Sequence, residues 1–396
     1  MKTIVAGAKV LLPEGIRQKQ VTVKDGRIMD VGEHAQPDPG DRLIRAEGLY
    51  LSPGFVDIHV HGGGGFSAMS GQARDVIGMA NAHALHGTTS ILPTTLASPI
   101  PKLVSAIEGV RSAAELPCDA TILGVHLEGP CLSPAQSGAQ SPDDLKIPAE
   151  TDLTPLYDAW PEGIRMMGAA PELPGAMTLG EELASRGITA SIAHSNATYD
   201  QVQEALRHGY SDVTHLYSSC SGMIRVHSYR IPGVIEAGLN LDELTVQVIA
   251  DGKHLPFSLL QLIYRCKGPE KIELITDGLD FSAGELVEGT VYRQLNGMET
   301  VYEDGVMKLL SRESFAGSVA TMHRCVRTMT EAGVPLPQAV RMASENPARR
   351  IGAARKGRIA KGMDADLLLL NEKLDLLWVM SRGRVIADEL PPDRKA

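Results

Sequence analysis

Eight short apolar runs in the middle of the chain constrain its fold more than any other feature. Segments with the periodicity of amphipathic helices lie between most of them. The runs cover residues 55–59, 89–92, 122–127, 166–169, 188–193, 212–216, 244–249 and 272–275. Alternating strands and helices are typical of parallel sheets, and eight such units favour a closed (β/α)₈ barrel of the TIM type over an open, doubly wound sheet. We therefore expect an α/β fold with a barrel over residues 53–353.

Both ends of the chain have a different pattern. Apolar and polar residues alternate there over short stretches, which is typical of antiparallel strands joined by hairpin turns. The stretches are 3–10, 20–24, 27–31, 357–359, 365–370, 376–380 and 384–387. Chain ends often lie close together at a domain surface, so we expect residues 1–52 and 354–396 to form one small β-sandwich domain.

One segment interrupts the expected barrel after its eighth strand. Residues 282–308 are rich in glycine and β-branched side chains and predict a β-hairpin insertion. Two helices are expected after this insertion, over residues 316–332 and 337–344. Earlier helices are expected over residues 72–86, 100–114, 178–186, 199–208 and 256–266.

Composition argues against some classes of partner. The chain carries 38 basic and 48 acidic residues, a net charge of -10, and has no run of Lys and Arg, so nucleic acid is not an expected partner. Its apolar segments are too short for a signal sequence or a membrane span, so no membrane contact is expected. Its five cysteines are scattered and include no Cys-x-x-Cys pair, which indicates reduced thiols in a cytoplasmic protein.

Ionisable side chains of one chemical kind follow the expected strands. His59 and His61 end the first run, and both imidazoles project to one side because alternate strand residues share a face. An isolated His-x-His pair is more often a loop feature than a metal site, so the interpretation depends on further ligands. Active sites of such barrels lie at the carboxyl ends of the strands. The side chains expected there are His59, His61, His126, Glu128, Glu172, His194, His215, Asp251, His254 and Asp277.

This set of side chains predicts a metal site. Buried ionisable groups without partners are costly, and one divalent cation can satisfy several of them together. Nitrogen and carboxylate ligands without thiolate suit Zn²⁺, Fe²⁺, Mn²⁺ or Co²⁺ in a catalytic site, and the sequence does not select among these ions. Such a metal activates water and polarises a carbonyl group, so hydrolysis of an unreactive bond is the expected chemistry.

Nine short motifs occur in one order across nearly the whole expected barrel. They are HVHGGGG, HGTTSILPTT, GVHLEGP, APELPG, AHSNATY, THLY, ADGKHLP, ITDGL and FAGS. In this order they resemble the N-acetylglucosamine-6-phosphate deacetylases of the amidohydrolase superfamily. The resemblance implies a metal-dependent barrel, a small β-sandwich built from both termini, and a homodimer. It also implies hydrolysis of the acetamide of N-acetylglucosamine 6-phosphate to glucosamine 6-phosphate and acetate.

The resemblance also assigns metal ligands. Glu128, His194 and His215 match the main ligands of the family. His59 and His61 match the members of the family in which both positions are histidine and a second ion can bind. One or two divalent ions per subunit are therefore expected, with Zn²⁺ the first choice and Fe²⁺, Mn²⁺ or Co²⁺ as alternatives.

The same resemblance implies roles for Asp277 and His254 and no metal-binding role for His126. Asp277 matches the general base and acid of the family. His254 matches the residue that contacts the sugar and helps to polarise the acetyl carbonyl. His126 matches no metal ligand, and we expect its role to be structural.

The expected substrate is a phosphorylated N-acetyl amino sugar, and its phosphate needs a cationic side chain. Arg230 matches the phosphate-binding arginine of the family, and Arg225 and His227 lie near it in the sequence. In family dimers a neighbouring subunit can complete this pocket. Residues 129–130 and 136–140, which include Gly138 and Ala139, are expected to shape the pocket for the sugar.

One departure from the family leaves alternatives open. After THLY the family usually has Asn-Ala, whereas this chain has Ser218 and Ser219, and Ser218 reaches less far than asparagine. A hydrolase of the same superfamily that acts on another N-acetylated amino sugar or its phosphate, an N-acyl amino acid or a cyclic amide is therefore the second hypothesis. The third is a barrel that binds without catalysis, against which the metal ligands and Asp277 argue.

Overall fold

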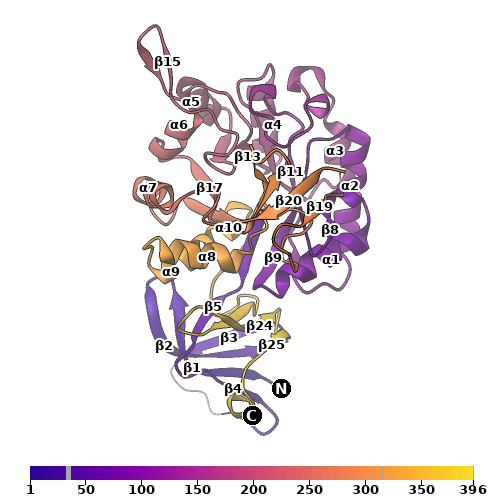
Figure 1. The fold of residues 1–396 in the computed structure, drawn as a ribbon. Coiled ribbons are helices and arrows are strands. Elements are labelled where there is room, and N and C mark those ends of the chain that lie inside the picture. The colour runs from indigo at the N-terminus through magenta and orange to yellow at the C-terminus, as the bar shows by residue number, and fades with distance from the viewer. Residues whose placement is uncertain (33–36, 296, 314, 396) are drawn as a thin grey trace.

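Parallel strands form a barrel in the upper part of the molecule (Figure 1). The computed structural model describes residues 1–32, 37–295, 297–313 and 315–395 of the chain. In the order in which they pair, the barrel strands are β6 (Phe55–Val60), β9 (Thr88–Thr95), β11 (Val125–Glu128), β12 (Ile164–Ala169), β13 (Thr189–Ile192), β14 (Tyr210–Val213), β17 (Thr245–Ile249) and β18 (Ile272–Ile275). A short strand, β10 (Thr121–Ile122), also pairs with β9.

The first and last strands of this series meet and close the barrel. Val60 forms a parallel bridge with Gly278. The backbone N–H of Asp277 donates to the carbonyl of His59 at 2.9 Å, and the N–H of His61 donates to Gly278 at 2.9 Å. Each barrel strand overlaps one of the apolar runs, so the (β/α)₈ prediction is confirmed.

Helices surround the barrel and bury one face against it. In α2, for example, Leu103, Ile107 and Val110 are buried at helical spacing. The helix α5 begins at a capping box of Thr198 and Gln201. The helices of the described residues are α1 (Ala73–Ala84), α2 (Ile100–Ala114), α3 (Thr154–Ala159), α4 (Ala176–Ser185), α5 (Tyr199–Arg207), α6 (Val234–Asn240), α7 (Phe257–Lys267), α8 (Met322–Glu331), α9 (Leu336–Met342) and α10 (Glu345–Arg350).

A mixed sheet below the barrel joins both ends of the chain (Figure 1). Its strands are β1 (Thr3–Leu12), β2 (Gly15–Lys24), β3 (Arg27–Gly32), β4 (Arg42–Arg45), β5 (Tyr50–Pro53), β23 (Leu367–Leu370), β24 (Leu376–Ser381) and β25 (Arg384–Asp388). The N-terminal β5 pairs with the C-terminal β23, and Trp378 is fully buried in the core of this sheet. Residues 33–36 lie outside the described residues, and the domain boundaries stay a prediction.

The strand expected at residues 357–359 does not form. Gly357 has φ 78°, and a Cβ there would lie 2.5 Å from the carbonyl oxygen of Ser344. This close approach requires glycine, and the segment turns against the C-terminal side of α9 instead of pairing with a strand.

An antiparallel sheet follows the eighth barrel strand. Its strands pair in sequence order: β19 (Val291–Arg293), β20 (Glu299–Glu303), β21 (Val306–Leu309) and β22 (Phe315–Gly317). The sheet thus extends beyond residue 308, and residue 296 lies outside the described residues. The helix expected from residue 316 begins only at Met322, because β22 pairs with β21 and takes up the first residues of that range.

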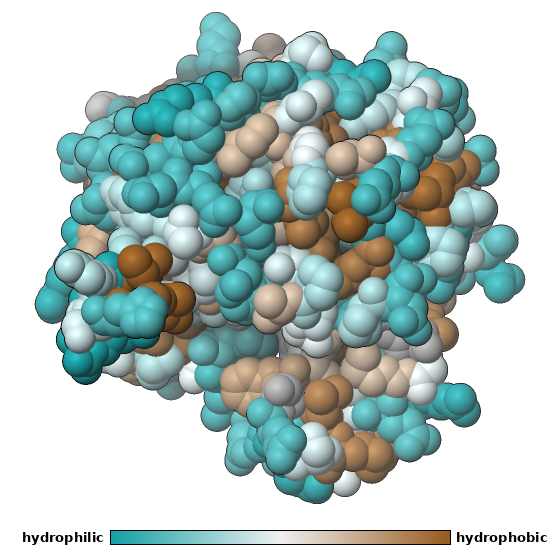
Figure 2. Space-filling view, turned by 90° about the horizontal axis from the view of Figure 1, so that it is seen from above, coloured by the Kyte–Doolittle hydropathy of each residue, from teal (hydrophilic) through white to brown (hydrophobic). Residues whose placement is uncertain are grey.

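Short elements complete the barrel face. They are the strands β7 (Gly62–Gly63), β8 (Phe66–Ser67), β15 (Ile224–Val226) and β16 (Tyr229–Ile231), and the 3-10 helices η1 (Ala68–Ser70), η2 (Pro134–Gln136), η3 (Pro142–Asp144) and η4 (Pro148–Glu150). A further 3-10 helix, η5 (Pro392–Arg394), lies beside the terminal sheet, where Arg394 donates to the carbonyls of Arg45 and Glu47. Figure 2 shows a mostly hydrophilic surface on which hydrophobic residues gather in separate patches. Within the described ranges, no helix combines the length and the apolar character that crossing a membrane requires.

Candidate metal centre and active site

Side chains from the carboxyl ends of several barrel strands converge in one place. Glu128 ends β11, and His194 and His215 follow β13 and β14. His194, His215 and Asp277 have φ values of 44°, 29° and 49°, in the left-handed region that residues other than glycine rarely adopt. Strain of this kind is typical of functional sites, and here it occurs directly after three strands whose ends carry candidate ligands.

The carboxylate of Glu128 lies at the centre of this group. Its Oε1 is 2.9 Å from His215 Nε2, 3.2 Å from His194 Nε2 and 3.4 Å from His59 Nε2. Its Oε2 is 3.3 Å from His61 Nε2. The two histidines of β6 also face each other, with 3.3 Å between their Nε2 atoms. All of these side chains are buried, and the distances are those of direct contact.

The other nitrogen of each imidazole has a partner that can only accept a hydrogen bond from it. The pairs are His61 Nδ1 with Thr94 O at 3.2 Å, His194 Nδ1 with Gln136 O at 2.8 Å, His215 Nδ1 with Ser218 O at 3.1 Å and His59 Nδ1 with Gln247 Oε1 at 3.1 Å. Gln247 presents its oxygen to His59 because its amide nitrogen donates to Asp212 Oδ2 at 2.7 Å. Each Nδ1 therefore carries the proton, and in the neutral ring each Nε2 carries a lone pair.

This arrangement fits a metal ion. When the rings are neutral, lone pairs on the Nε2 atoms face carboxylate oxygens, and this contact between acceptors is relieved by a metal ion between them or by a proton on Nε2. The potential ligand atoms form two sets, and within each set all atoms lie within 4.8 Å of one another. One set comprises His59, His61 and Glu128, and the other comprises Glu128, His194 and His215. Because Glu128 belongs to both sets, the site has ligands for one or two ions. Imidazole and carboxylate ligands held by outer hydrogen bonds are typical of catalytic divalent metals.

Electrostatics at the site also favour positive charge. Burial disfavours a charged imidazolium, but Asp277 and Glu128 outweigh burial and raise the pKa of His61 to about 10. Burial likewise raises the pKa of Glu128, yet His59 and His194 hold it well below its ordinary value. The carboxylates are therefore anionic at neutral pH and attract a cation to the gap between them.

Asp277 lies beside the set formed by His59, His61 and Glu128. Its Oδ1 is 3.1 Å from His61 Nε2 and 3.5 Å from His59 Nε2. Burial raises the pKa of Asp277, but the hydrogen bond with His61 and the nearby histidine charges outweigh burial and lower it. Its side chain is 16% exposed, against 2% for Glu128, so Asp277 is the carboxylate that a substrate can reach. An ionised carboxylate in this position can accept a proton.

His254 lies on the loop after β17, as the sequence predicted. Its Nδ1 donates to Asp251 Oδ2 at 2.7 Å, and Asp251 Oδ1 accepts the backbone N–H groups of Lys253 and His254 at 2.8 Å. These bonds outweigh burial and lower the pKa of Asp251. The imidazole ring lies 5.0 Å from the ring of Phe315 in β22. Asp251 thus fixes the orientation of His254.

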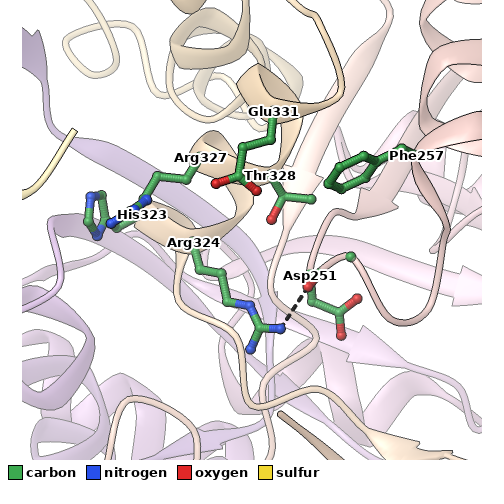
Figure 3. A pocket seen from close by; sticks show the side chains of 8 residues that line it. Asp251, Phe257, His323, Arg324, Arg327, Thr328 and Glu331 are labelled. Atoms are coloured by element: carbon green, nitrogen blue, oxygen red, sulfur yellow. Dashed lines mark hydrogen bonds between the residues drawn. The ribbon is translucent and has the colours of Figure 1, made fainter. Parts of the chain in front are cut away.

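A cavity of about 390 Å³ lies behind this loop, and Figure 3 shows the side chains that line it. Arg324 of α8 donates to the carbonyl oxygen of Asp251 at 2.8 Å, the dashed line in Figure 3, and to Gly305 O at 3.0 Å. One guanidinium therefore ties α8 to the loop of His254 and to the inserted sheet. The sequence contained no signal for this contact, because Arg324 and Asp251 are far apart along the chain.

The loop between η2 and η3 approaches the metal ligands closely. A Cβ at Gly138 would lie 2.6 Å from Ser219 Oγ and 3.3 Å from His194 Cε1, and Gly138 has φ 57°. Ser218 accepts the Nδ1 proton of His215 with its backbone carbonyl. The structure therefore brings Gly138, Ser218 and Ser219 to the metal ligands, with Ala139 next to them.

Arg225, His227 and Arg230 lie together on the β15–β16 hairpin. Arg225 and Arg230 are paired across its two strands, and all three side chains are exposed. The hairpin projects away from the barrel (Figure 1). Arg230 donates to Ser228 O at 3.4 Å, and no described contact joins these three side chains to the metal ligands.

Gln140 belongs to the segment 136–140 that the sequence predicted to shape the sugar pocket, and the structure adds a contact with a metal ligand. Its amide nitrogen donates to Glu128 Oε2 at 2.6 Å, and its amide oxygen accepts the backbone N–H of Ala97 at 2.8 Å. The N–H of Ala97 thereby fixes which end of the amide faces Glu128. The sequence predicted a place for Gln140 near the sugar but not its contact with Glu128.

Two other polar side chains at this end of the barrel make structural contacts. His126 donates from Nδ1 to Ile58 O at 3.0 Å, and burial holds its pKa well below the ordinary value. Glu172 accepts the hydroxyl of Ser195 at 2.7 Å and the backbone N–H of Asn196 at 2.6 Å. Neither belongs to the two sets of metal-ligating atoms found in the described part of the chain.

Comparison with known proteins agrees with this geometry. The model of the Amidohydrolase family matches residues 50–386. The chain belongs to the amidohydrolase family. This amidohydrolase is 32% identical over 372 residues to N-acetylglucosamine-6-phosphate deacetylase of Lysinibacillus sphaericus, with 93% of each chain covered. It is 30% identical over 390 residues to N-acetylgalactosamine-6-phosphate deacetylase of Escherichia coli O157:H7, with 97% of this chain and 99% of the relative covered.

A solved structure extends the likeness to the fold. The amidohydrolase matches a mutant N-acetyl-D-glucosamine-6-phosphate deacetylase from Mycobacterium smegmatis in complex with N-acetyl-D-glucosamine-6-phosphate, with a TM-score of 0.86 and 30% identity. The match covers 98% of this chain and 99% of the other. The barrel and the terminal sheet therefore both have counterparts in that structure.

Proposed function

We propose that this amidohydrolase hydrolyses the acetamide of N-acetylglucosamine 6-phosphate to glucosamine 6-phosphate and acetate. The observation that carries the proposal is the meeting of imidazole Nε2 atoms with the carboxylate of Glu128, beside the ionised Asp277. The names of relatives that match over nearly the whole chain support this choice of substrate. A second hydrolase function, on another acylated substrate, has less support from these relatives.

The proposed cofactor is a divalent metal, one or two ions per subunit. Glu128, His194 and His215 would hold the first ion, and His59 and His61 would hold a second together with Glu128. Zn²⁺ is the first choice for these ligands, and Fe²⁺, Mn²⁺ and Co²⁺ are the alternatives. When bound, such an ion polarises a carbonyl and lowers the pKa of a bound water to about 7.

The chain's own residues would supply the proton transfers. An amide nitrogen is a poor leaving group, so it must be protonated as the C–N bond breaks. Asp277 accepts the proton of the attacking water and returns it to the departing nitrogen. His254, whose ring Asp251 holds through Nδ1, contacts the sugar and helps to polarise the acetyl carbonyl with its other edge.

The proposed substrate pocket continues toward the β15–β16 hairpin. Arg230 would bind the phosphate, with Arg225 and His227 beside it, because arginine matches phosphate geometry with two parallel hydrogen bonds. Gly138, Ala139, Ser218 and Ser219 would contact the sugar. The exposure of the hairpin arginines in a single chain leaves room for a neighbouring subunit to complete this pocket.

We propose a homodimer in the cytoplasm as the working state. Met223 and Ile224 are each 56% exposed and Tyr229 is 75% exposed, so the hairpin presents apolar surface that a second copy could cover. The five cysteines are unpaired, which suits a reducing compartment.

Acetate release from N-acetylglucosamine 6-phosphate by the metal-loaded protein tests the proposal. N-acetylgalactosamine 6-phosphate and unphosphorylated N-acetylglucosamine are the comparison substrates. Substituting Arg230 with Ala should raise KM for the phosphorylated sugar at least tenfold, since a hydrogen bond to a charged group contributes about 1.5–3 kcal/mol. Arg207→Ala, at another exposed arginine, should leave KM unchanged. Absence of acetate from every phosphorylated sugar would refute the proposal.

A further inference from the structure

A cavity of about 790 Å³ opens beside the metal ligand His61. His61 and Gln140 line its inner end. One side of the cavity belongs to the barrel and the other to the inserted sheet and the turn that precedes it. The apolar side chains that line it are Met69, Leu96, Ala97, Ala139, Leu279, Leu295, Met298 and Ala316. The volume is that of a binding pocket for a small molecule and far exceeds the space that an acetyl methyl group fills.

The cavity adjoins only one end of the Glu128 carboxylate. At the Oε1 end of this carboxylate lie His194 and His215, and Gly138 approaches His194 there. At the Oε2 end lie His61 and Gln140, which line the cavity. Three of the residues proposed to contact the sugar, Gly138, Ser218 and Ser219, therefore lie at one end of this carboxylate, and the cavity, which Ala139 also lines, opens at the other end.

An amide held at this centre must point its two substituents in different directions. The nitrogen carries the sugar, and the carbonyl carbon carries the acyl substituent. With the sugar at the end where Gly138 and His194 lie, the acyl substituent is directed toward His61, where the cavity opens.

Charge in the cavity also favours an acyl group over a phosphate. Three carboxylates, those of Asp75, Asp144 and Asp280, line it together with one ammonium group, that of Lys102. This excess of negative charge disfavours an anion. A neutral chain, in contrast, can pack against the apolar side chains on both sides of the cavity.

We propose that this cavity receives the acyl group, and that the protein also hydrolyses N-acyl glucosamine 6-phosphates whose acyl chains are longer than acetyl, such as butanoyl and hexanoyl. The inference rests on the proposed function, because it uses the same centre and the same sugar. Water adds across the amide: the C–N bond breaks, a C–O bond forms and the nitrogen receives the proton. The products are glucosamine 6-phosphate and the corresponding carboxylic acid.

The test compares kcat/KM for N-acetyl, N-butanoyl and N-hexanoyl glucosamine 6-phosphate, with the released amine as readout. A pocket closed around the acetyl group would lose about 10–200-fold for each added methylene. Because the cavity is open, we expect kcat/KM for both longer substrates to stay within about tenfold of the value for the acetyl compound. A larger fall with normal acetyl hydrolysis overturns this inference and leaves the proposed function intact. Hydrolysis of none of the three refutes both.

Two matched tryptophan substitutions locate the acyl chain. Leu295 is 61% exposed and lines the cavity, whereas Val291 is 53% exposed, lies in the same inserted segment and does not line it. Leu295→Trp should lower the ratio of hexanoyl to acetyl kcat/KM at least tenfold, and Val291→Trp should keep the wild-type ratio. An unchanged ratio in Leu295→Trp, or an equal fall in both variants, would overturn the assignment. If Leu295→Trp does not fold, the substrate series on the wild-type protein still decides.

Discussion

Replacing Asp277 with asparagine should slow acetate release without dispersing the metal ligands. Asparagine has nearly the same shape as aspartate and keeps an oxygen near His61, which lies 3.1 Å from Asp277 in the structure. It cannot accept a proton. Acid-base catalysis of this kind contributes about 10²–10⁴-fold. At 1.36 kcal/mol for each factor of ten, the activation free energy should rise by about 2.7–5.4 kcal/mol.

The assay for Asp277→Asn measures kcat for acetate release and the metal content of the same sample. Glu172→Gln is the matched control, because Glu172 lies at the same end of the barrel but binds Ser195 and Asn196. We expect Glu172→Gln to keep kcat within a few-fold of the wild type. If Asp277→Asn kept its metal and more than a tenth of wild-type turnover, the assignment of proton transfer to Asp277 would be wrong.

Two further predictions concern a buried carboxyl and the amide that holds Glu128. Burial raises the pKa of Glu273 from 4.5 to about 8. Between these pH values the folded state therefore binds more protons than the unfolded state. The free energy of unfolding should fall as the pH rises, by at most about 1.4 kcal/mol per pH unit. Glu273→Gln should remove this slope in urea unfolding at pH 5 to 8, and an unchanged slope would contradict the assignment. Gln140→Leu removes the donor to Glu128 and should weaken metal binding by about 10–100-fold in a chelator competition; unchanged affinity would exclude this role.

The barrel was predictable because its strands are buried on both faces. All residues of β6 and β9 are buried, so both strands contain apolar runs that can be recognised without an alignment. The polar ends of β9 were not predicted. Thr88 and Thr95 belong to the strand because they pair with neighbouring strands, and the apolar pattern does not indicate this pairing.

The inserted sheet was harder to predict because long-range pairing decides its extent. Residues 316 and 317 lie inside the range predicted as helix, although Ser318 and the N-cap Thr321 separate them from α8. They form a strand because β22 pairs with β21. Sequence periodicity alone does not contain this information.

At the site too, some residues were predictable from the sequence and others were not. His59, His61, Glu128, His194 and His215 could be found because each lies at or next to the end of an apolar run. The residues that orient them are of ordinary type and lie far away in the sequence, such as Gln247, whose amide is set by Asp212. Their roles follow from hydrogen-bond direction, which requires the folded chain.

The central claim is that Glu128, His194 and His215 hold a divalent ion that the reaction requires. The direct measurement is the number of ions per chain, by mass spectrometry, in samples dialysed against a chelator, together with acetate release from the same samples. Acetate release should fall in step with bound metal and return when Zn²⁺ is added back. Full turnover in protein that holds far less than one ion per chain would contradict the claim.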